Sequence, residues 1–194
     1  MRRTLLALPF ALLPLSIAQA DSHEHVHDHD HAHEEHGSLG VHEHGVASLN
    51  VALDGQTLEI QLESPAMNLV GFEHEAKSDA DKAKVATARK HLKQPQALFA
   101  LPIEAKCALQ KSELDSPLFG GREHEEQEHA DEHGHSDIDA SYRFACANAE
   151  ALQTLELGSF FGTFPGTEKL EVQLIGPSGQ QGAELTPKSS RLSF

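Results

Sequence analysis

Residues 42–63 read His-Glu-His-Gly-Val-Ala-Ser-Leu-Asn-Val-Ala-Leu-Asp-Gly-Gln-Thr-Leu-Glu-Ile-Gln-Leu-Glu, and this stretch decides the fold. Polar and apolar residues alternate on both sides of Asp54-Gly55, a pattern that predicts a β-hairpin closed by a type I′ turn. A two-residue turn at Asp54-Gly55 places Leu53 opposite Gln56 and carries the apolar side chains of both strands to one face. The turn and the hydrophobic pattern therefore predict the same hairpin.

Three histidines flank this hairpin and form the first predicted metal site. His42 and His44 are two residues apart on a strand end, so we expect them to project to the same side. The predicted register places His44 opposite Pro65. His74 lies about two helical turns beyond Pro65, so the chain either folds back and brings it towards that strand end or leaves it out of reach. Three imidazoles with an open or carboxylate-filled fourth position suit zinc. The alternative is that His42 and His44 only end a histidine-rich tail and that His74 is a surface residue.

Residues 1–20 have the features of a secretory signal peptide: two arginines, an apolar run too short to span a bilayer, and Ala18-Gln19-Ala20 as the cleavage site. Cleavage after Ala20 starts the mature chain at Asp21. The residue directly after this site is Asp21 and not a cysteine, so we expect no lipid anchor in the membrane. The whole chain has 15 basic and 30 acidic residues and a charge of −15, and loss of Arg2 and Arg3 makes it −17. This charge disfavours nucleic acid and anionic membranes as partners and attracts cations.

The mature chain is predicted to contain a disordered His-rich tail at 21–40 and a single α+β domain at 41–194, with a His-rich insertion loop at 115–137. We expect antiparallel β-hairpins with short helices, including a helix from Ser78 to Lys93. His91 lies near the end of that helix, where the helix dipole accounts for a cation. Gln-Thr-Leu-Glu at 56–59 recurs at 153–156, which raises the possibility of two related halves.

Cys107 and Cys146 are the only cysteines. In an exported protein such a pair is most simply one disulfide, which would tether the His-rich loop between them. A redox or metal-binding role is the alternative, although the cysteines lack C-x-x-C spacing.

Two further histidine groups are predicted to bind metal. In the insertion, a helix would place His129 and His133 at i and i+4 on one face, with His124 and His135 in reserve. The alternative is a solvated acidic insertion with incidental histidines. In the tail, the predicted ligands are His23, His25, His27, His29, His31, His33 and His36. After cleavage, the new terminus Asp21-Ser22-His23 can also bind Cu(II) or Ni(II) in a square-planar nitrogen set.

Patterns of catalysis are weak in this chain. H-E-x-x-H at 23–27 and H-x-x-E-H at 129–133 resemble zinc protease motifs, but such matches are expected by chance in tracts made of His, Asp and Glu. The sequence contains no phosphate loop, nucleophile elbow or recognisable triad. We therefore expect no enzyme activity, and a metallohydrolase is a distant alternative.

Several motifs resemble those of the ZrgA-type zinc-uptake proteins of Gram-negative bacteria. The quoted stretch His42–Val51, the segment Glu63–His74, the cysteine pair around a histidine-rich loop, Phe164-Pro165-Gly166 and Ala183–Pro187 carry the likeness. The resemblance implies a periplasmic zinc-binding protein that assists zinc uptake alongside an ATP-driven importer or its binding protein. Only His42, His44 and His74 fall within the matching motifs.

The predicted function is therefore capture of Zn(II) by histidine clusters in the periplasm, followed by its transfer. Because the neutral imidazole is the ligand and histidine titrates near about pH 6.5, zinc affinity should fall in acid. The rival interpretation is a storage or detoxification sponge for zinc, copper or nickel.

Overall fold

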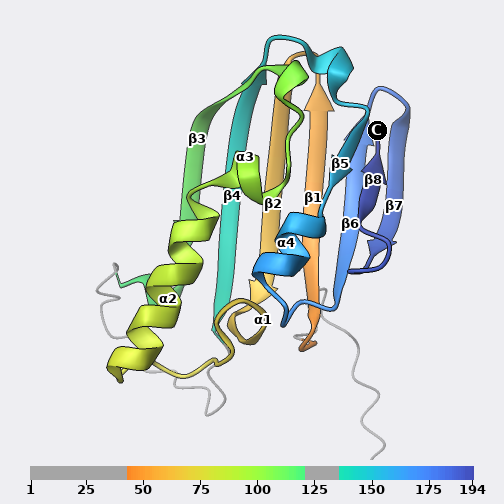
Figure 1. Ribbon diagram of the computed structural model, residues 1–194. Coiled ribbons are helices and arrows are strands. Elements are labelled where there is room, and N and C mark those ends of the chain that lie inside the picture. Colours follow the sequence, from red (N-terminus) through yellow and green to blue (C-terminus); the bar gives the residue numbers. More distant parts are fainter. Residues whose placement is uncertain (1–42, 121–135) are drawn as a thin grey trace, which may run out of the picture. The chain divides into compact units, whose positions relative to one another are not determined.

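The structure, a computed structural model, describes residues 43–120 and 136–194 and has a six-stranded mixed sheet as its centre (Figure 1). The strand order is β3-β4-β2-β1-β6-β7, and a second, two-stranded sheet pairs β5 with β8. The strands are β1 Val46–Asp54, β2 Thr57–Pro65, β3 Cys107–Asp115, β4 Asp137–Cys146, β5 Thr154–Glu156, β6 Lys169–Gly176, β7 Gly179–Leu185 and β8 Arg191–Ser193. The helices are α1 Ala66–Val70, α2 Asp79–Leu92, α3 Pro95–Leu98, η1 Ile103–Ala105, η2 Pro117–Phe119, η3 Ala149–Ala151 and α4 Gly158–Thr163.

The β1-β2 hairpin has the predicted apolar face, but the predicted register is wrong by two residues. Asp54 pairs with Thr57 and Leu53 with Leu58, so the loop residues are Gly55 and Gln56. Gly55 takes a positive φ of 56° and Gln56 does not, which excludes type I′. This arrangement leaves the positive φ to glycine, which bears it at little cost, and sets Leu53 against a leucine instead of a glutamine.

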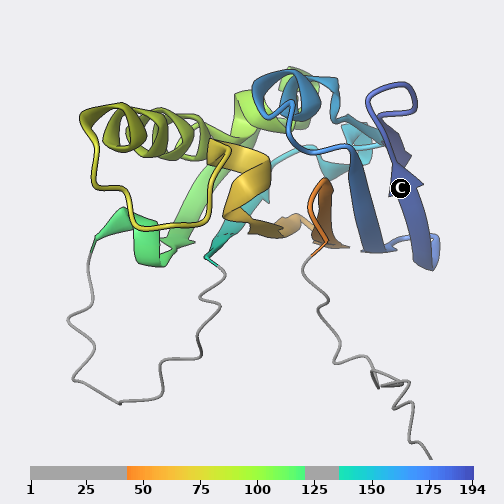
Figure 2. The ribbon, with the colours of Figure 1, turned by 90° about the horizontal axis from the view of Figure 1, so that it is seen from below.

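Helices cover one face of the large sheet (Figure 2). Side chains facing this layer are buried in alternation along β1, β2, β4 and β6, as expected for a sheet with one covered face. Phenylalanines fill the space between the layers, and Phe99 and Phe160 stack with ring centroids 6.3 Å apart. Leu98, Phe144, Phe161 and Phe164 are also buried in this layer.

The predicted helix is confirmed as α2. The Ser78 hydroxyl caps it by accepting a hydrogen bond from the Asp81 backbone N–H at 3.0 Å. Its buried stripe consists of Val85, Ala88 and Leu92. None of the helices in the two described ranges has the length and hydropathy of a membrane span.

Two features of the topology could not be foreseen from the pattern. Strand β1 pairs with β6 in parallel, so the sheet is mixed. The two Gln-Thr-Leu-Glu copies lie in different sheets, one at the start of β2 and the other at β5, although each strand precedes a short helix.

The predicted disulfide between Cys107 and Cys146 is confirmed. It joins directly paired residues of β3 and β4, with Cα atoms 3.8 Å apart, and Cys146 is fully buried. The Cys146 N–H also donates to the Gln56 carbonyl at 2.7 Å. The disulfide therefore links the edge strand β3 to β4, and the Cys146 hydrogen bond links β4 to the loop of the β1-β2 hairpin.

Reduction of this disulfide is expected to destabilise the fold. The 39-residue separation of the cysteines corresponds to a loss of about 4 kcal/mol in the chain-entropy account. Urea denaturation of the protein with and without a thiol reductant measures the difference. An unchanged midpoint, with reduction verified by thiol titration, would contradict the prediction.

The uncovered face of the sheet carries a cross-strand row of carboxylates. Asp139 on β4 lies opposite Asp115 on one side and Glu63 on the other. Partial desolvation, followed by the neighbouring charges of Glu63, Asp137 and Asp115, raises the pKa of Asp139 above its ordinary value. Like charges that face each other across strands destabilise a sheet.

Asp139→Asn is therefore expected to stabilise the protein at pH 7 by about 0.5–1 kcal/mol. Because the folded-state pKa of Asp139 is raised, its ionised form weakens the fold at neutral pH, and the gain should vanish once the carboxyl is protonated in both states. Urea denaturation at pH 7 and at successively lower pH, to below the ordinary value of 3.8, tests this. Glu171→Gln is the matched control, because Glu171 lies 2.8 Å from Lys169 Nζ and its removal breaks an ion pair. An equal gain in both variants would refute the assignment.

Candidate metal site

The segment before β1 is a tight turn that presents His44. The Val46 N–H donates to the Glu43 carbonyl at 3.0 Å, which closes a four-residue turn with His44 and Gly45 at its centre. Gly45 has a φ of +88°, as the third residue of a type II turn requires. The prediction that His44 lies on the strand end is therefore wrong, because β1 begins only at Val46.

The side chain of Asn68 on α1 fixes this turn. Asn68 is 3% exposed, and its Oδ1 accepts a hydrogen bond from the Gly45 N–H at 2.7 Å. Its Nδ2 donates to the Val46 carbonyl at 2.8 Å and to the Ser64 hydroxyl at 3.3 Å. The amide of this one side chain thus gives hydrogen-bond partners to backbone groups at the start of β1 that would otherwise be buried without one.

The other side of the turn is held by the segment that leads into β6. The Gly45 carbonyl accepts hydrogen bonds from the N–H groups of Glu168 and Lys169 at 2.7 and 2.9 Å. Gly166 lies so close to the backbone of Asn68 that an added Cβ would come within 2.6 Å of its carbonyl oxygen. His44 therefore stands on a backbone that is fixed from two directions.

His44 contacts a carboxylate that follows α1. His44 Nε2 lies 3.1 Å from Glu73 Oε1, with the imidazole 55% and the carboxylate 14% exposed. The Glu73 backbone is also held, because its carbonyl accepts a hydrogen bond from the Ser136 hydroxyl at 2.9 Å. Imidazole and carboxylate are both ligands of zinc, so this pair provides two donors of the kind that zinc uses.

His74 is adjacent in sequence and has one nitrogen fixed. Its ring stacks on Phe72 at a centroid distance of 4.7 Å, and Nδ1 lies 3.0 Å from the Glu75 carbonyl oxygen. A carbonyl can only accept, so this contact assigns the proton to Nδ1 and leaves Nε2 as the acceptor. Metal-binding histidines commonly donate their second nitrogen to a carbonyl in this way.

Of the predicted three-histidine site the structure describes His44 and His74, and His44 contacts Glu73, the residue directly before His74. The described residues of the protein contain no group of three or more His, Cys, Asp or Glu side chains arranged to hold a metal ion. Glu73 was missed by the sequence reasoning, although its place directly before His74 was a usable signal. His91 lies on α2 against the edge of Phe164, with centroids 6.3 Å apart.

The remaining predicted ligands lie outside the described residues. They are His42, the insertion histidines His124, His129, His133 and His135, the tail histidines His23, His25, His27, His29, His31, His33 and His36, and the terminal Asp21 and Ser22. The described chain resumes at Ser136, whose hydroxyl contacts Glu73, and begins at Glu43, next to His44. Both histidine-rich segments are therefore joined to the fold beside the His44–Glu73 pair.

Comparison with known proteins gives one family. Residues 41–194 match the family described as "ZrgA family zinc uptake protein". No curated protein is similar enough to the chain to count as a match.

Substitution of Asn68 by alanine is expected to destabilise the protein by about 2–3 kcal/mol, because the Gly45 N–H and the Val46 carbonyl lose their partner in a buried place. Urea denaturation measures the loss, and hydrogen exchange of the Gly45 amide reports it locally. Ser64→Ala is the matched control, since it removes the long 3.3 Å contact to Asn68 but leaves the turn held. Equal losses in the two variants would contradict the role given to Asn68.

Proposed function

The chain belongs to the ZrgA family of zinc uptake proteins and so has a role in zinc uptake, and we propose that it captures Zn(II) in the periplasm through histidine side chains and passes the ion on. The contact of His44 with Glu73, at the fixed start of β1, supports this as the place where the folded domain binds zinc. We propose no bond-making chemistry and no enzyme activity for the protein.

In this proposal His44, Glu73 and His74 supply ligands from the folded domain. His44 and Glu73 are held side by side before any ion arrives, so little side-chain freedom is lost when they bind. A carboxylate only accepts, so His44 Nε2 donates its proton to Glu73 in this contact, and that proton leaves if zinc binds at Nε2. The Nδ1 contact of His74 leaves its Nε2 lone pair for a metal. Zinc completes its coordination with four ligands, and His42 is the nearest further histidine in the sequence.

The histidines of the tail and of the insertion are proposed as additional ligands that raise the number of ions captured. These tracts enter the fold at Glu43 and Ser136, both beside the His44–Glu73 pair. An ion captured by either tract can therefore pass to the fixed pair over a short distance. We further propose that an ATP-driven zinc importer, or its binding protein, receives the ion.

Two related proposals concern the processed terminus. Cleavage after Ala20 would export the chain and expose Asp21-Ser22-His23 as a Cu(II) or Ni(II) site. The confirmed disulfide accords with an oxidising compartment. Titration of the mature protein with Cu(II) should give a square-planar visible band that disappears when the terminal amine is blocked. Absence of that band would remove the copper and nickel proposal without affecting the zinc proposal.

Zinc calorimetry of the mature protein tests the main proposal. Substitution of His44, Glu73 and His74 together by alanine is expected to weaken the tightest site at least tenfold, because each removes a proposed ligand. His91→Ala is the matched control, since His91 is an exposed histidine that contacts Phe164 and should leave the affinity unchanged.

A second pair of proteins separates the scaffold from the tracts. Deletion of residues 21–40 should lower the number of zinc ions bound while keeping the tightest site. If that site survives the triple substitution but is lost with the tail, the placement at His44 is wrong.

A further inference from the structure

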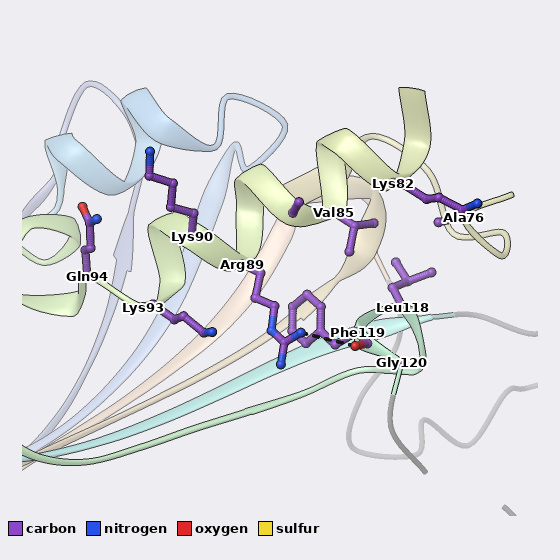
Figure 3. A pocket seen from close by; sticks show the side chains of 11 residues that line it. Ala76, Lys82, Val85, Arg89, Lys90, Lys93, Gln94, Leu118, Phe119 and Gly120 are labelled. Atoms are coloured by element: carbon purple, nitrogen blue, oxygen red, sulfur yellow. Dashed lines mark hydrogen bonds between the residues drawn. The ribbon is translucent and has the colours of Figure 1, made fainter. Parts of the chain in front are cut away.

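A basic groove lies beside α2 on this acidic protein. It has a volume of about 730 Å³ and runs between α2 and the short helix η2 (Figure 3). Lys82, Arg89 and Lys93 lie along the α2 side, at positions separated by seven and four residues and so on one helix face. Lys90 also lines the groove, but its side chain points away from this row in Figure 3. Leu118 and Phe119 form the opposite, apolar side.

The three cations are not neutralised by the described fold. Ion pairs in residues 43–120 and 136–194 involve other basic residues, such as Lys77, Lys111 and Arg143, and none involves Lys82, Arg89 or Lys93. In a chain with twice as many acidic as basic residues, a row of cations without a carboxylate partner among the described residues is unexpected.

The helix dipole accounts for only part of this row. Cations are favoured in the last turn of a helix, which covers Arg89 and Lys93. Lys82 lies near the beginning of α2, where a cation is disfavoured. The dipole therefore does not explain why the row extends along the whole helix.

The groove wall is held in place by specific contacts. The Arg89 guanidinium lies 5.3 Å from the centroid of the Phe119 ring, and its Nη1 donates to the Phe119 carbonyl at 3.4 Å. Ser116 caps η2 by accepting from the Leu118 N–H at 3.2 Å, and its hydroxyl donates to the Asp137 carbonyl at 2.6 Å. The apolar side is thus anchored to the start of β4.

We propose that this groove binds an extended acidic segment of a partner protein. The eleven residue-to-residue steps from Lys82 to Lys93 rise about 16 Å along the helix, which matches about five residues of extended chain. A row of separated cations matches the successive carboxylates of an extended acidic segment better than it matches a compact anion. Leu118 and Phe119 supply a surface for an apolar side chain within that segment.

The groove also leads to the proposed zinc ligands. Ala76, which lines the same end of the groove as Lys82 in Figure 3, follows His74 by two residues. A partner segment in the groove would therefore end close to the site from which zinc is to be passed on. This consequence rests on the proposed function, whereas binding of the segment does not.

Binding is tested without zinc, so that its result is independent of the metal site. The probe is a fluorescein-labelled peptide, Glu-Asp-Leu-Glu-Asp-Glu, and the readout is fluorescence anisotropy with the full mature chain. Replacement of Lys82, Arg89 and Lys93 together by glutamine should weaken binding at least tenfold, and added salt should weaken binding to the unaltered protein. A peptide with Gln and Asn in place of the acids should not bind.

The matched control replaces Lys84, Lys106 and Lys188 by glutamine, which removes the same charge from exposed positions outside the groove. It should change the affinity less than twofold, and thermal melts check that both variants are folded. Equal losses in the two variants would overturn the proposal.

Two further arms identify other occupants. If the peptide binds only after residues 121–135 are replaced by a Gly-Ser segment of equal length, the groove serves the chain's own acidic stretch and the partner proposal fails. If phosphatidylglycerol vesicles bind through the same three cations and the peptide does not, the surface is a membrane contact and the proposal fails as well.

Discussion

The amide of Asn68 is the contact on which the start of the central strand depends. It joins α1 to the turn before β1 through the Gly45 N–H and to the strand itself through the Val46 carbonyl. The same turn is tied to the entrance of β6 by the Gly45 carbonyl. A buried side chain that makes hydrogen bonds to the backbone of a neighbouring element fixes the position of the two elements relative to each other. This explains why His44, although exposed, has a fixed place beside Glu73.

Charge is distributed unevenly over the fold: carboxylates gather on the uncovered face of the sheet, and cations gather beside α2. The open face of the sheet sets Asp139 between Asp115 and Glu63, an arrangement that costs stability at neutral pH. The α2 face collects cations beside an apolar wall. The net charge alone predicts only attraction to cations, because it averages over both faces.

The sequence predicts the parts of the fold that depend on local chemistry. The alternation of residues 46–63 determines which face of the hairpin is buried, and Ser78 determines where α2 begins. The exact register does not follow, because Asp54-Gly55 is compatible with loops that differ by one residue at each side, and packing of Leu53 against Leu58 decides between them. The parallel pairing of β1 with β6 depends on contacts more than a hundred residues apart, for which no local signal exists.

The same distinction applies to the site. His-Gly at 44–45 encodes a type II turn through the glycine, and this could have been recognised from sequence. The contact of His44 with Glu73 joins residues far apart in the sequence and depends on the hydrogen bonds by which Asn68 fixes the turn. No rule of residue spacing predicts it.

A fixed pair beside two histidine-rich tracts has a thermodynamic rationale for uptake. A tract predicted to lack a core must give up about 1–2 kcal/mol of backbone entropy for every residue that it orders around an ion, so its single sites are weak and exchange readily. His44 and Glu73 are ordered by folding before the ion arrives. In the proposed function, a ligand that a tract supplies close to its anchor at Glu43 or Ser136 would order only a short stretch of chain. Affinity should therefore increase from the outer histidines towards the fold. In the proposed function, such a gradient would draw captured ions to one point on the surface, from which an acceptor would remove them.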